Sequence, residues 1–183
     1  MKSAVANEHE QGWDFEKAAM PYVDSLYNTA YRMTRNSEDA EDLVQETYLK
    51  ALRAYASFQA GTNFRAWMFR ILRNAFLNSR TGQMYKTAVS LDSDEPTTAR
   101  EAVAAGGTPE SDYFRVRNRA AIAQAIESLP LPFREVLLLS DVEEMSYADI
   151  ATTLALPIGT VTSRLGRARR RLREILRDDV VRE

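Results

Sequence analysis

Arginine is concentrated near the end of the chain, in a pattern that suits binding to a polyanion. Residues 157–177 contain seven arginines and one acid, a local net charge of +6, although the whole chain carries a formal net charge of −2. Guanidinium groups bind phosphate oxygens and base edges, so this concentration of positive charge favours a nucleic-acid partner. The alternative is a solvated helix face without a partner, because charge runs are common on exposed helices.

Other chemistry has few candidate residues. The chain has no cysteine and its single histidine is His9, so the usual zinc sites and the usual pairs of nucleophile and base are excluded. The phosphate-binding P-loop and GxGxxG motifs are also missing. Asp39, Asp42 and Glu46 share one predicted helical face and could bind a metal, but no further ligand accompanies them. We therefore expect no enzymatic activity, no metal and no cofactor.

Two short helices joined by a turn are predicted to position the arginines. Ser146 suits the N-cap of the first helix, and Asp149 three residues later gives a capping-box pattern. Pro157 interrupts the helical spacing, and Gly159 is expected to take turn angles that other residues avoid. Thr160 would then cap the second helix. A capped helix, a turn and a capped basic helix together predict a helix-turn-helix.

The second helix of this motif is predicted to bury one apolar stripe and to expose the arginines. In a helix-turn-helix, the amino-terminal part of this helix enters the major groove and reaches base edges, while later basic residues hold phosphates. The predicted stripe consists of Val161, Leu165, Ala168, Leu172, Ile175 and Leu176. The predicted DNA contacts are Thr160, Thr162, Ser163, Arg164, Arg167, Arg170 and Arg171.

The first part of the chain shows the apolar spacing of three further helices. The first is predicted over residues 15–34 with a kink or break at Pro21, the second runs from a cap at Ser37 to about Tyr55, and the third covers residues 64–80 after a cap at Thr62 or Asn63. Trp67 in the third helix is better explained as a core residue than as a ligand-binding one.

The second and third of these helices carry many charged side chains. Taken alone, the charges of the second helix favour a solvated face stabilised by pairs such as Glu46 with Lys50. The third helix mixes arginines with aromatic rings, which suits contact with unpaired bases and their phosphates. The charged face of the second helix consists of Asp39, Asp42, Glu46, Lys50 and Arg53, and the third helix carries Arg65, Arg70, Arg73, Asn74 and Arg80.

The composition changes between the two helical parts. Residues 81–111 contain many small and polar residues, with glycines, prolines and little periodicity, which predicts a flexible linker. Helical spacing returns from Asp112 to Leu129, and Pro132 begins a further helix. We therefore predict an all-α protein with two small helical domains joined by a flexible linker, the second ending in the helix-turn-helix. The predicted parts are an N-terminal tail at residues 1–14, a first domain at residues 15–80, the linker and a second domain at residues 112–183.

The amino terminus carries no targeting pattern. Its first residues have no long apolar run and acquire acids early, so the segment is neither a signal peptide nor an anchor. The lack of cysteine fits a reducing compartment. We therefore expect a cytoplasmic protein without membrane insertion.

The order of these segments resembles that of the extracytoplasmic-function (ECF) sigma factors, the minimal sigma-70 family subunits of bacterial RNA polymerase. The matching segments are DAEDLVQETYLKALRAYASF, FRAWMFRILRNAFLNSR, LPLPFREVLLLSDVEEMSYADIA and LPIGTVTSRLGRARRRLR, which fall within roughly residues 20–80 and 112–177. The resemblance implies an alternative sigma factor that binds core RNA polymerase. Such a protein directs initiation by recognising the minus thirty-five and minus ten promoter elements and helps to melt DNA.

The resemblance also implies roles for individual residues. The helix-turn-helix would read the minus thirty-five element, although family members often carry larger residues at the positions of Thr162 and Gly166. The acidic helix would dock on a coiled coil of the largest polymerase subunit through Asp39, Asp42, Gln45, Glu46 and Lys50. The first domain would bind the minus ten element through Phe58, Asn63, Arg70, Arg73, Asn74 and Arg80.

Two segments are similar to the oxidative-stress branch of this family, namely TAYRMTRNSEDAEDLVQETYLKALRAY and GTNFRAWMFRILRN. Members of that branch are held inactive by a zinc-binding anti-sigma factor, so the implied partners are core polymerase, promoter DNA and an anti-sigma factor. The alternative function is a free-standing dimeric helix-turn-helix regulator. The basic and aromatic third helix speaks against it, because a dimerisation domain does not need one.

Overall fold

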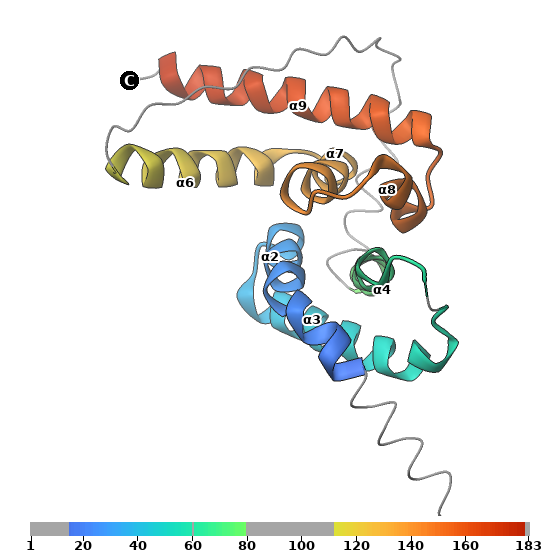
Figure 1. The fold of residues 1–183 in the computed structure, drawn as a ribbon. Coiled ribbons are helices and arrows are strands. Elements are labelled where there is room, and N and C mark those ends of the chain that lie inside the picture. Colours follow the sequence, from blue (N-terminus) through green and yellow to red (C-terminus); the bar gives the residue numbers. More distant parts are fainter. Residues whose placement is uncertain (1–14, 60, 80–111, 182–183) are drawn as a thin grey trace, which may run out of the picture. The chain divides into compact units, whose positions relative to one another are not determined.

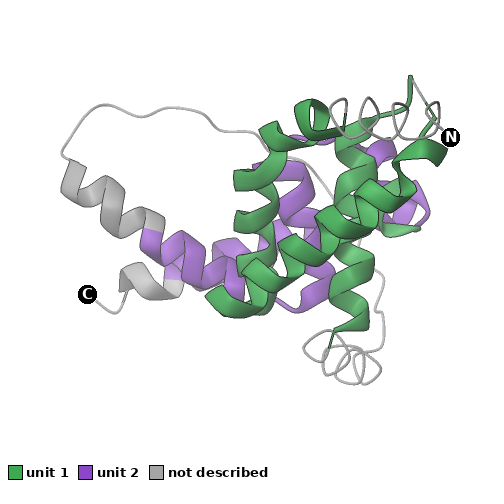
Figure 2. Ribbon diagram, turned by 90° about the horizontal axis from the view of Figure 1, so that it is seen from below, with its two compact units in different colours: residues 1–87, 152–155 green, residues 88–151, 156–183 purple. Residues whose placement is uncertain are grey.

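The computed structural model describes residues 15–59, 61–79 and 112–181. Within these ranges every regular element is a helix, which confirms the all-α prediction (Figure 1). The chain forms two compact units, residues 1–87 with 152–155 and residues 88–151 with 156–183 (Figure 2). The predicted N-terminal tail and linker lie outside the described residues.

The first unit contains three long helices that pack on one another. Residues 15–19 are helical, followed by η1 (Met20–Tyr22), α2 (Val23–Thr34), α3 (Ser37–Ala54), η2 (Tyr55–Ser57) and α4 (Phe64–Asn78). Each of α2, α3 and α4 contacts the other two. Pro21 lies in η1, a 3-10 turn between two α-helical segments, because its ring excludes a continuous α-helix. The predicted break at Pro21 is confirmed.

In the first unit, α3 and α4 each begin at an asparagine cap. The Asn36 side chain accepts a hydrogen bond from the backbone N–H of Asp39 at 3.1 Å, so the predicted cap at Ser37 is wrong by one residue. Asn36 and Ser37 are both good capping residues, and the sequence alone does not separate them. Asn63 caps α4 by accepting from the N–H of Ala66 at 3.1 Å, which decides between the two predicted alternatives.

The core of the first unit follows the predicted stripes in α3 but not throughout α4. Ala40, Leu43 and Ala51 of α3 are buried. In α4, Phe69 is buried, whereas Trp67 is only half-buried, so its assignment to the core is wrong. The remaining buried apolar residues of α2 and α4 are Leu26, Ala30, Met33, Ala66, Met68, Leu72, Ala75 and Phe76.

A tyrosine ties α3 to the helical residues 15–19. The hydroxyl of Tyr48 donates a hydrogen bond to the carbonyl oxygen of Ala19 at 2.7 Å, and burial raises the pKa of Tyr48 to about 12. Phe15 packs edge-on against the rings of Tyr48 and Tyr55. These contacts hold the start of the described chain against the end of α3.

In the second unit, the predicted recognition helix packs against two other helices. The elements of this unit are α6 (Asp112–Ser128), α7 (Leu131–Leu137), the π-helical turn η3 (Leu138–Val142), the first part of α8 (Tyr147–Leu154) and α9 (Ile158–Val181). The last residues of α8, 152–154, are grouped with the first unit. α9 packs on α7 and runs beside α6 in the opposite direction (Figure 1). Pro132 lies in the first turn of α7, as predicted. The apolar spacing gives no sign of the π-helical turn.

A buried arginine closes the end of α6. Arg134 of α7 is 1% exposed, and its Nη2 donates hydrogen bonds to the carbonyl oxygens of Glu127 and Leu129. The last carbonyls of a helix have no partner within the helix, so this guanidinium supplies the missing donors and joins α6 to α7.

Candidate nucleic-acid interface

The first helix of the helix-turn-helix begins at the predicted cap. The hydroxyl oxygen of Ser146 accepts from the backbone N–H of Asp149 at 3.1 Å and donates to the Asp149 carboxylate at 2.8 Å. This pairing fixes the start of α8 and stabilises it by about 1 kcal/mol, the usual value of an N-cap.

The turn differs from the prediction in where its special backbone angles lie. Ala155, not Gly159, is left-handed, with a φ of 52°. The N–H of Leu156 donates to the carbonyl of Ala151 at 2.9 Å, which is the long-range bond of a Schellman motif and ends α8. Because the chain reverses at Ala155, Gly159 lies inside the first turn of α9. The special role predicted for Gly159 is therefore wrong.

The second helix also begins earlier than predicted. α9 starts at Ile158, and the carbonyl oxygen of Pro157 accepts from the N–H groups of Thr160 and Val161 at 2.9 and 3.1 Å. Thr160 is thus within the helix and is not its cap. A proline can precede a helix because its missing N–H is not needed there.

The inner and outer faces of α9 are those that the spacing predicts. Val161, Leu165 and Ala168 are buried, whereas Leu172, Ile175 and Leu176 are half-buried. The predicted DNA contacts all have surface available to a partner. Thr162, Arg170 and Arg171 are exposed, and Thr160, Ser163, Arg164 and Arg167 are half-buried.

The hydroxyl groups at the start of α9 have their protons engaged. Thr162 donates to the carbonyl of Gly159 at 3.0 Å, and Ser163 donates to that of Thr160 at 3.1 Å. Each hydroxyl oxygen keeps lone pairs that can still accept, which suits the exposed amino groups of adenine or cytosine in the major groove. A Cβ added at Gly159 would meet nothing within 4 Å, so the surface beside these hydroxyls is open.

The charged face of α3 is more complex than a solvated surface. Asp39, Asp42 and Gln45 are exposed, while Glu46 and Lys50 are half-buried and form the predicted ion pair. Two leucines missed by the sequence reasoning lie among them: Leu49 is 56% exposed and Leu52 is 48% exposed. Large apolar residues exposed beside charges are a feature of protein-binding surfaces. Both leucines fall on the side of the predicted helix opposite its buried stripe, and this spacing could have identified them as exposed.

The residues predicted for the first unit's DNA site are only partly brought together. Phe58 packs against Trp67 with ring centroids 5.1 Å apart. Trp67, Arg70 and Asn74 recur at helical spacing and share one side of α4, where Arg70 and Asn74 are exposed. Asn63 lies at the start of this helix, with its side-chain oxygen used in the cap. Arg73 is half-buried, and Arg80 lies outside the described residues.

Two further properties concern the described residues alone. They include no group of three histidine, cysteine, aspartate or glutamate side chains that could hold a metal ion. No helix in the described ranges is long and apolar enough to cross a membrane.

Comparison with known proteins identifies both units. The family model for Sigma-70 region 2 matches residues 19–84, and that for Sigma-70, region 4 matches residues 119–172. The ECF RNA polymerase sigma factor SigW of Bacillus subtilis is 32% identical to this chain, over 86% of each protein. The chain belongs to the ECF sigma factors. Promoter recognition by RNA polymerase is the function of this family, and its members are not enzymes.

Other relatives support the same family. The ECF sigma factor SigE of Mycolicibacterium smegmatis is 37% identical, and the match covers 88% of this chain but 64% of SigE. A solved structure with a similar fold is the sigma factor RpoE in complex with the anti-sigma factor NepR from Bartonella quintana. That chain is 30% identical with a TM-score of 0.66, over 90% of this chain and 97% of RpoE. In this sigma factor, the region 2 match includes α2, α3 and α4, and the region 4 match includes the helix-turn-helix.

Proposed function

We propose that this sigma factor divides promoter recognition between its two helical parts. Residues 15–80 dock on core RNA polymerase and engage the minus ten element, residues 112–183 read the minus thirty-five element, and residues 81–111 join them. The observation that carries the proposal is the outer face of α9, because arginines lie along this second helix of a helix-turn-helix whose first helix is capped. Separate weak contacts gain from effective concentration when both parts are held on one polymerase, so the isolated chain should bind DNA weakly.

Within the second part, the first turns of α9 enter the major groove of the minus thirty-five element. The hydroxyl oxygens of Thr162 and Ser163, whose protons are already donated, accept from base amino groups, and Arg164 and Arg167 reach base acceptors such as those of guanine. The remaining contacts, Thr160, Arg170 and Arg171, hold the DNA backbone and set the register of the helix.

Within the first part, the outer face of α3 docks on a coiled coil of the largest polymerase subunit. The exposed Leu49 and Leu52 supply the apolar part of this face, and polar and charged residues beside them form its rim, a mixture found in other protein interfaces. The rim consists of Asp39, Asp42, Gln45, Glu46 and Lys50.

The minus ten element contacts the surface formed by α4 and the loop before it. Phe58 stacks parallel on Tyr55, with an angle of 5° between the rings, and packs on Trp67, so it is held in one orientation. A rigid aromatic group suits stacking with a base extruded from the non-template strand, which costs a few kcal/mol to unstack. The other residues assigned to this site are Asn63, Arg70, Arg73, Asn74 and Arg80.

Regulation by an anti-sigma factor is the third part of the proposal. The complex of RpoE with NepR supports it, because that sigma factor resembles this chain over most of its length. We assign this chain to the branch controlled by a zinc-binding anti-sigma factor, on the strength of the segments around α3 and α4. With no cysteine of its own, the sigma factor would rely on its partner for any redox-sensing thiol. Its place of action is the cytoplasm, with RNA polymerase.

Run-off transcription with core polymerase tests the proposal most simply. The wild-type chain should create new start sites on a library of promoter fragments. Asp42→Arg combined with Glu46→Arg should abolish them, because two acids of the docking rim are reversed. A matched control, Glu16→Arg with Asp24→Arg, reverses two exposed acids outside α3 and should retain the start sites. Tight, palindromic DNA binding by the chain alone, without any new start sites, would instead support a free-standing regulator.

A further inference from the structure

An ion pair with two hydrogen bonds links the recognition helix to the π-helical turn. Nε of Arg169 donates to Oδ2 of Asp141 at 3.1 Å, and Nη2 donates to Oδ1 at 2.7 Å. Both side chains are partly open to solvent, with 42% of Arg169 and 36% of Asp141 exposed. Such bidentate pairing fixes the direction of a guanidinium more strongly than a single contact does.

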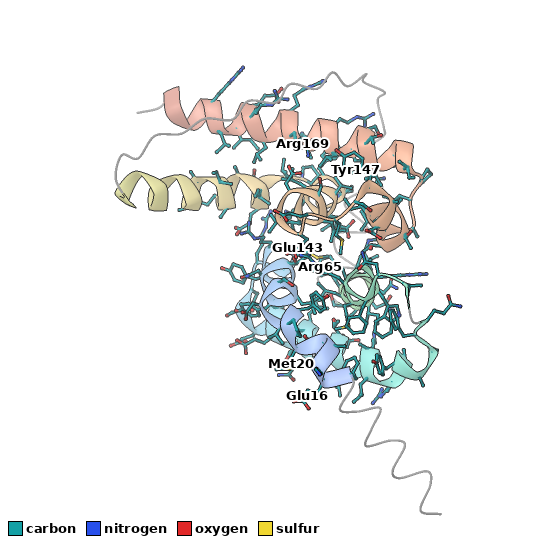
Figure 3. All side chains as sticks on the ribbon, in the orientation of Figure 1. Glu16, Met20, Arg65, Glu143, Tyr147 and Arg169 are labelled. Atoms are coloured by element: carbon teal, nitrogen blue, oxygen red, sulfur yellow. The ribbon has the colours of Figure 1, made fainter. Side chains whose placement is uncertain are left out.

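Several groups of the second unit converge on Arg169. Its hydrogen bond to Asp141 raises the pKa of Arg169, partial burial acts in the opposite sense, and Tyr147 adds a smaller rise. Arg169 and Tyr147 lie on facing elements of the unit (Figure 3). Nε of Arg173 donates to the carbonyl oxygen of Arg169 at 3.3 Å, so the next turn of α9 is joined to the same residue.

Three other arginines of α9 differ from Arg169 in this respect. Among the residues that the structure describes, Arg164, Arg170 and Arg171 form no ion pair. Their charges are available to phosphates, whereas the charge of Arg169 is already matched by a carboxylate. A phosphate contact by Arg169 would have to replace two hydrogen bonds that exist without DNA, so little would be gained.

We infer that Asp141 withholds Arg169 from DNA phosphates, and that Arg169 is a positioning residue for α9 rather than a DNA contact. The inference rests on the proposed role of α9 in reading DNA. Phosphate contacts strengthen binding to every sequence alike, because the backbone carries no sequence information. Withholding one arginine from the backbone therefore lowers binding to promoter and non-promoter DNA alike and leaves the ratio between them unchanged.

The salt dependence of DNA binding distinguishes a withheld arginine from a phosphate contact. The holoenzyme, formed from full-length chain and core polymerase, is titrated with promoter and non-promoter DNA over a range of KCl concentrations. Each phosphate contact contributes about 0.9 to the slope of log K against log salt. Arg170→Ala should flatten the slope by about that amount. Arg169→Ala should leave the slope unchanged, and Asp141→Ala should steepen it and tighten binding to promoter and non-promoter DNA alike.

A double variant separates the pair from general charge effects. If Asp141 acts by holding Arg169, then Asp141→Ala should have no effect on the slope in an Arg169→Ala background. Glu174→Ala removes an equal charge from the exposed surface of α9, and its effect should be the same in both backgrounds. Asp141→Asn keeps one acceptor and should give a slope between the slopes of wild type and Asp141→Ala. It serves as a second variant if Asp141→Ala does not fold.

Two results would overturn the inference. One is an equal effect of Asp141→Ala with and without Arg169, since the carboxylate would then act only by its charge. The other is a flattening of the slope by Arg169→Ala as large as that by Arg170→Ala, since Arg169 would then contact a phosphate. Failure of the proposed function would look different: the wild-type chain would direct no transcription, and neither promoter nor non-promoter binding would respond to Arg170→Ala.

Discussion

α3 of the first unit and α9 of the second are both amphipathic helices, of 18 and 24 residues. Their outer faces differ in net charge and in the side chains that accompany the charges. Five acids and two basic residues occur in α3, and seven arginines and three acids in α9. In both helices an apolar stripe, centred on residues such as Leu43 and Leu165, is buried in the unit's core. The stripe builds the unit, while the opposite face is free to select a partner.

The two outer faces also differ in what accompanies the charge. On α3, the exposed Leu49 and Leu52 follow a stretch that contains five acids, and a protein surface offers both charge and apolar area to such a face. On the outer face of α9, arginines accompany small hydroxyl and glycine positions, and the space beside Gly159 is open. The sign of the charge alone is therefore a weak guide to the class of partner, and the side chains beside the charges indicate it better.

The largest expected effect comes from truncating the buried apolar stripe that both helices have. Leu165→Ala in α9 and Leu43→Ala in α3 should each lower the free energy of unfolding by about 2 to 5 kcal/mol, because each leaves a cavity in a core. Urea denaturation measures this change. Leu52→Ala is the control, since its exposed side chain should alter the free energy of unfolding by less than about 0.5 kcal/mol. Equal effects at all three positions would contradict the assigned faces.

A second prediction sharpens the difference between the outer faces. Leu49→Ala with Leu52→Ala should weaken binding to core polymerase by about 1 to 3 kcal/mol, because apolar groups near the centre of an interface carry much of its energy. Binding of a fluorescently labelled chain to core polymerase gives the affinity. The same truncation at the exposed Ile122 of α6 should leave that affinity unchanged. A docking face made of charges alone would show no loss for the leucine pair.

A third prediction divides the arginines of α9 by role. Arg167→Ala should cost about 1 to 3 kcal/mol and relax selection at one promoter position, because it removes a base contact. Arg171→Ala should weaken all promoter variants alike and flatten the salt slope by about 0.9, because it removes a phosphate contact. Promoter libraries scored by holoenzyme binding give both quantities. If the two variants show the same promoter selection and the same salt slope, then Arg167 and Arg171 do not differ as base contact and phosphate contact.

The smallest expected effect lies in the turn before α9. Ala155 has a φ of 52°, which costs a residue with a Cβ about 1 kcal/mol more than it costs glycine. Ala155→Gly should therefore raise the free energy of unfolding by about 0.5 to 1 kcal/mol, less the added entropy of the unfolded chain. Thermal unfolding would show a small rise in Tm. A decrease would mean that the methyl group of Ala155 makes a contact worth more than the strain.

Much of the fold could be predicted because it follows from local rules. Apolar spacing determines where helices form, and a proline such as Pro21 or Pro132 determines where they break or begin. The cap at Ser146 was equally predictable, since its partner is only three residues away. Where two neighbouring residues could serve the same purpose, as Asn36 and Ser37 could, the local rule did not choose between them.

What could not be predicted depends on residues far apart in the chain. The guanidinium of Arg134 is buried because α6 ends beside it, and no pattern in the sequence shows that encounter. The pair between Asp141 and Arg169 spans 28 positions and depends on the π-helical turn. In the candidate site, the outer residues of α9 were predictable from periodicity. The exposed Leu49 and Leu52 were not recognised, because a solvated face was the simpler explanation of the charges around them.

If the outer face of α3 binds polymerase and that of α9 binds DNA, then variants of each face should lose one of these two events and keep the other. Affinity for core polymerase and protection of the minus thirty-five element are compared for Asp42→Arg with Glu46→Arg and for Arg164→Ala with Arg167→Ala. We predict that the α3 variant loses core affinity, whereas the α9 variant keeps it within about twofold and loses the protection. An α3 variant that still binds core normally, or an α9 variant that does not, would contradict the account.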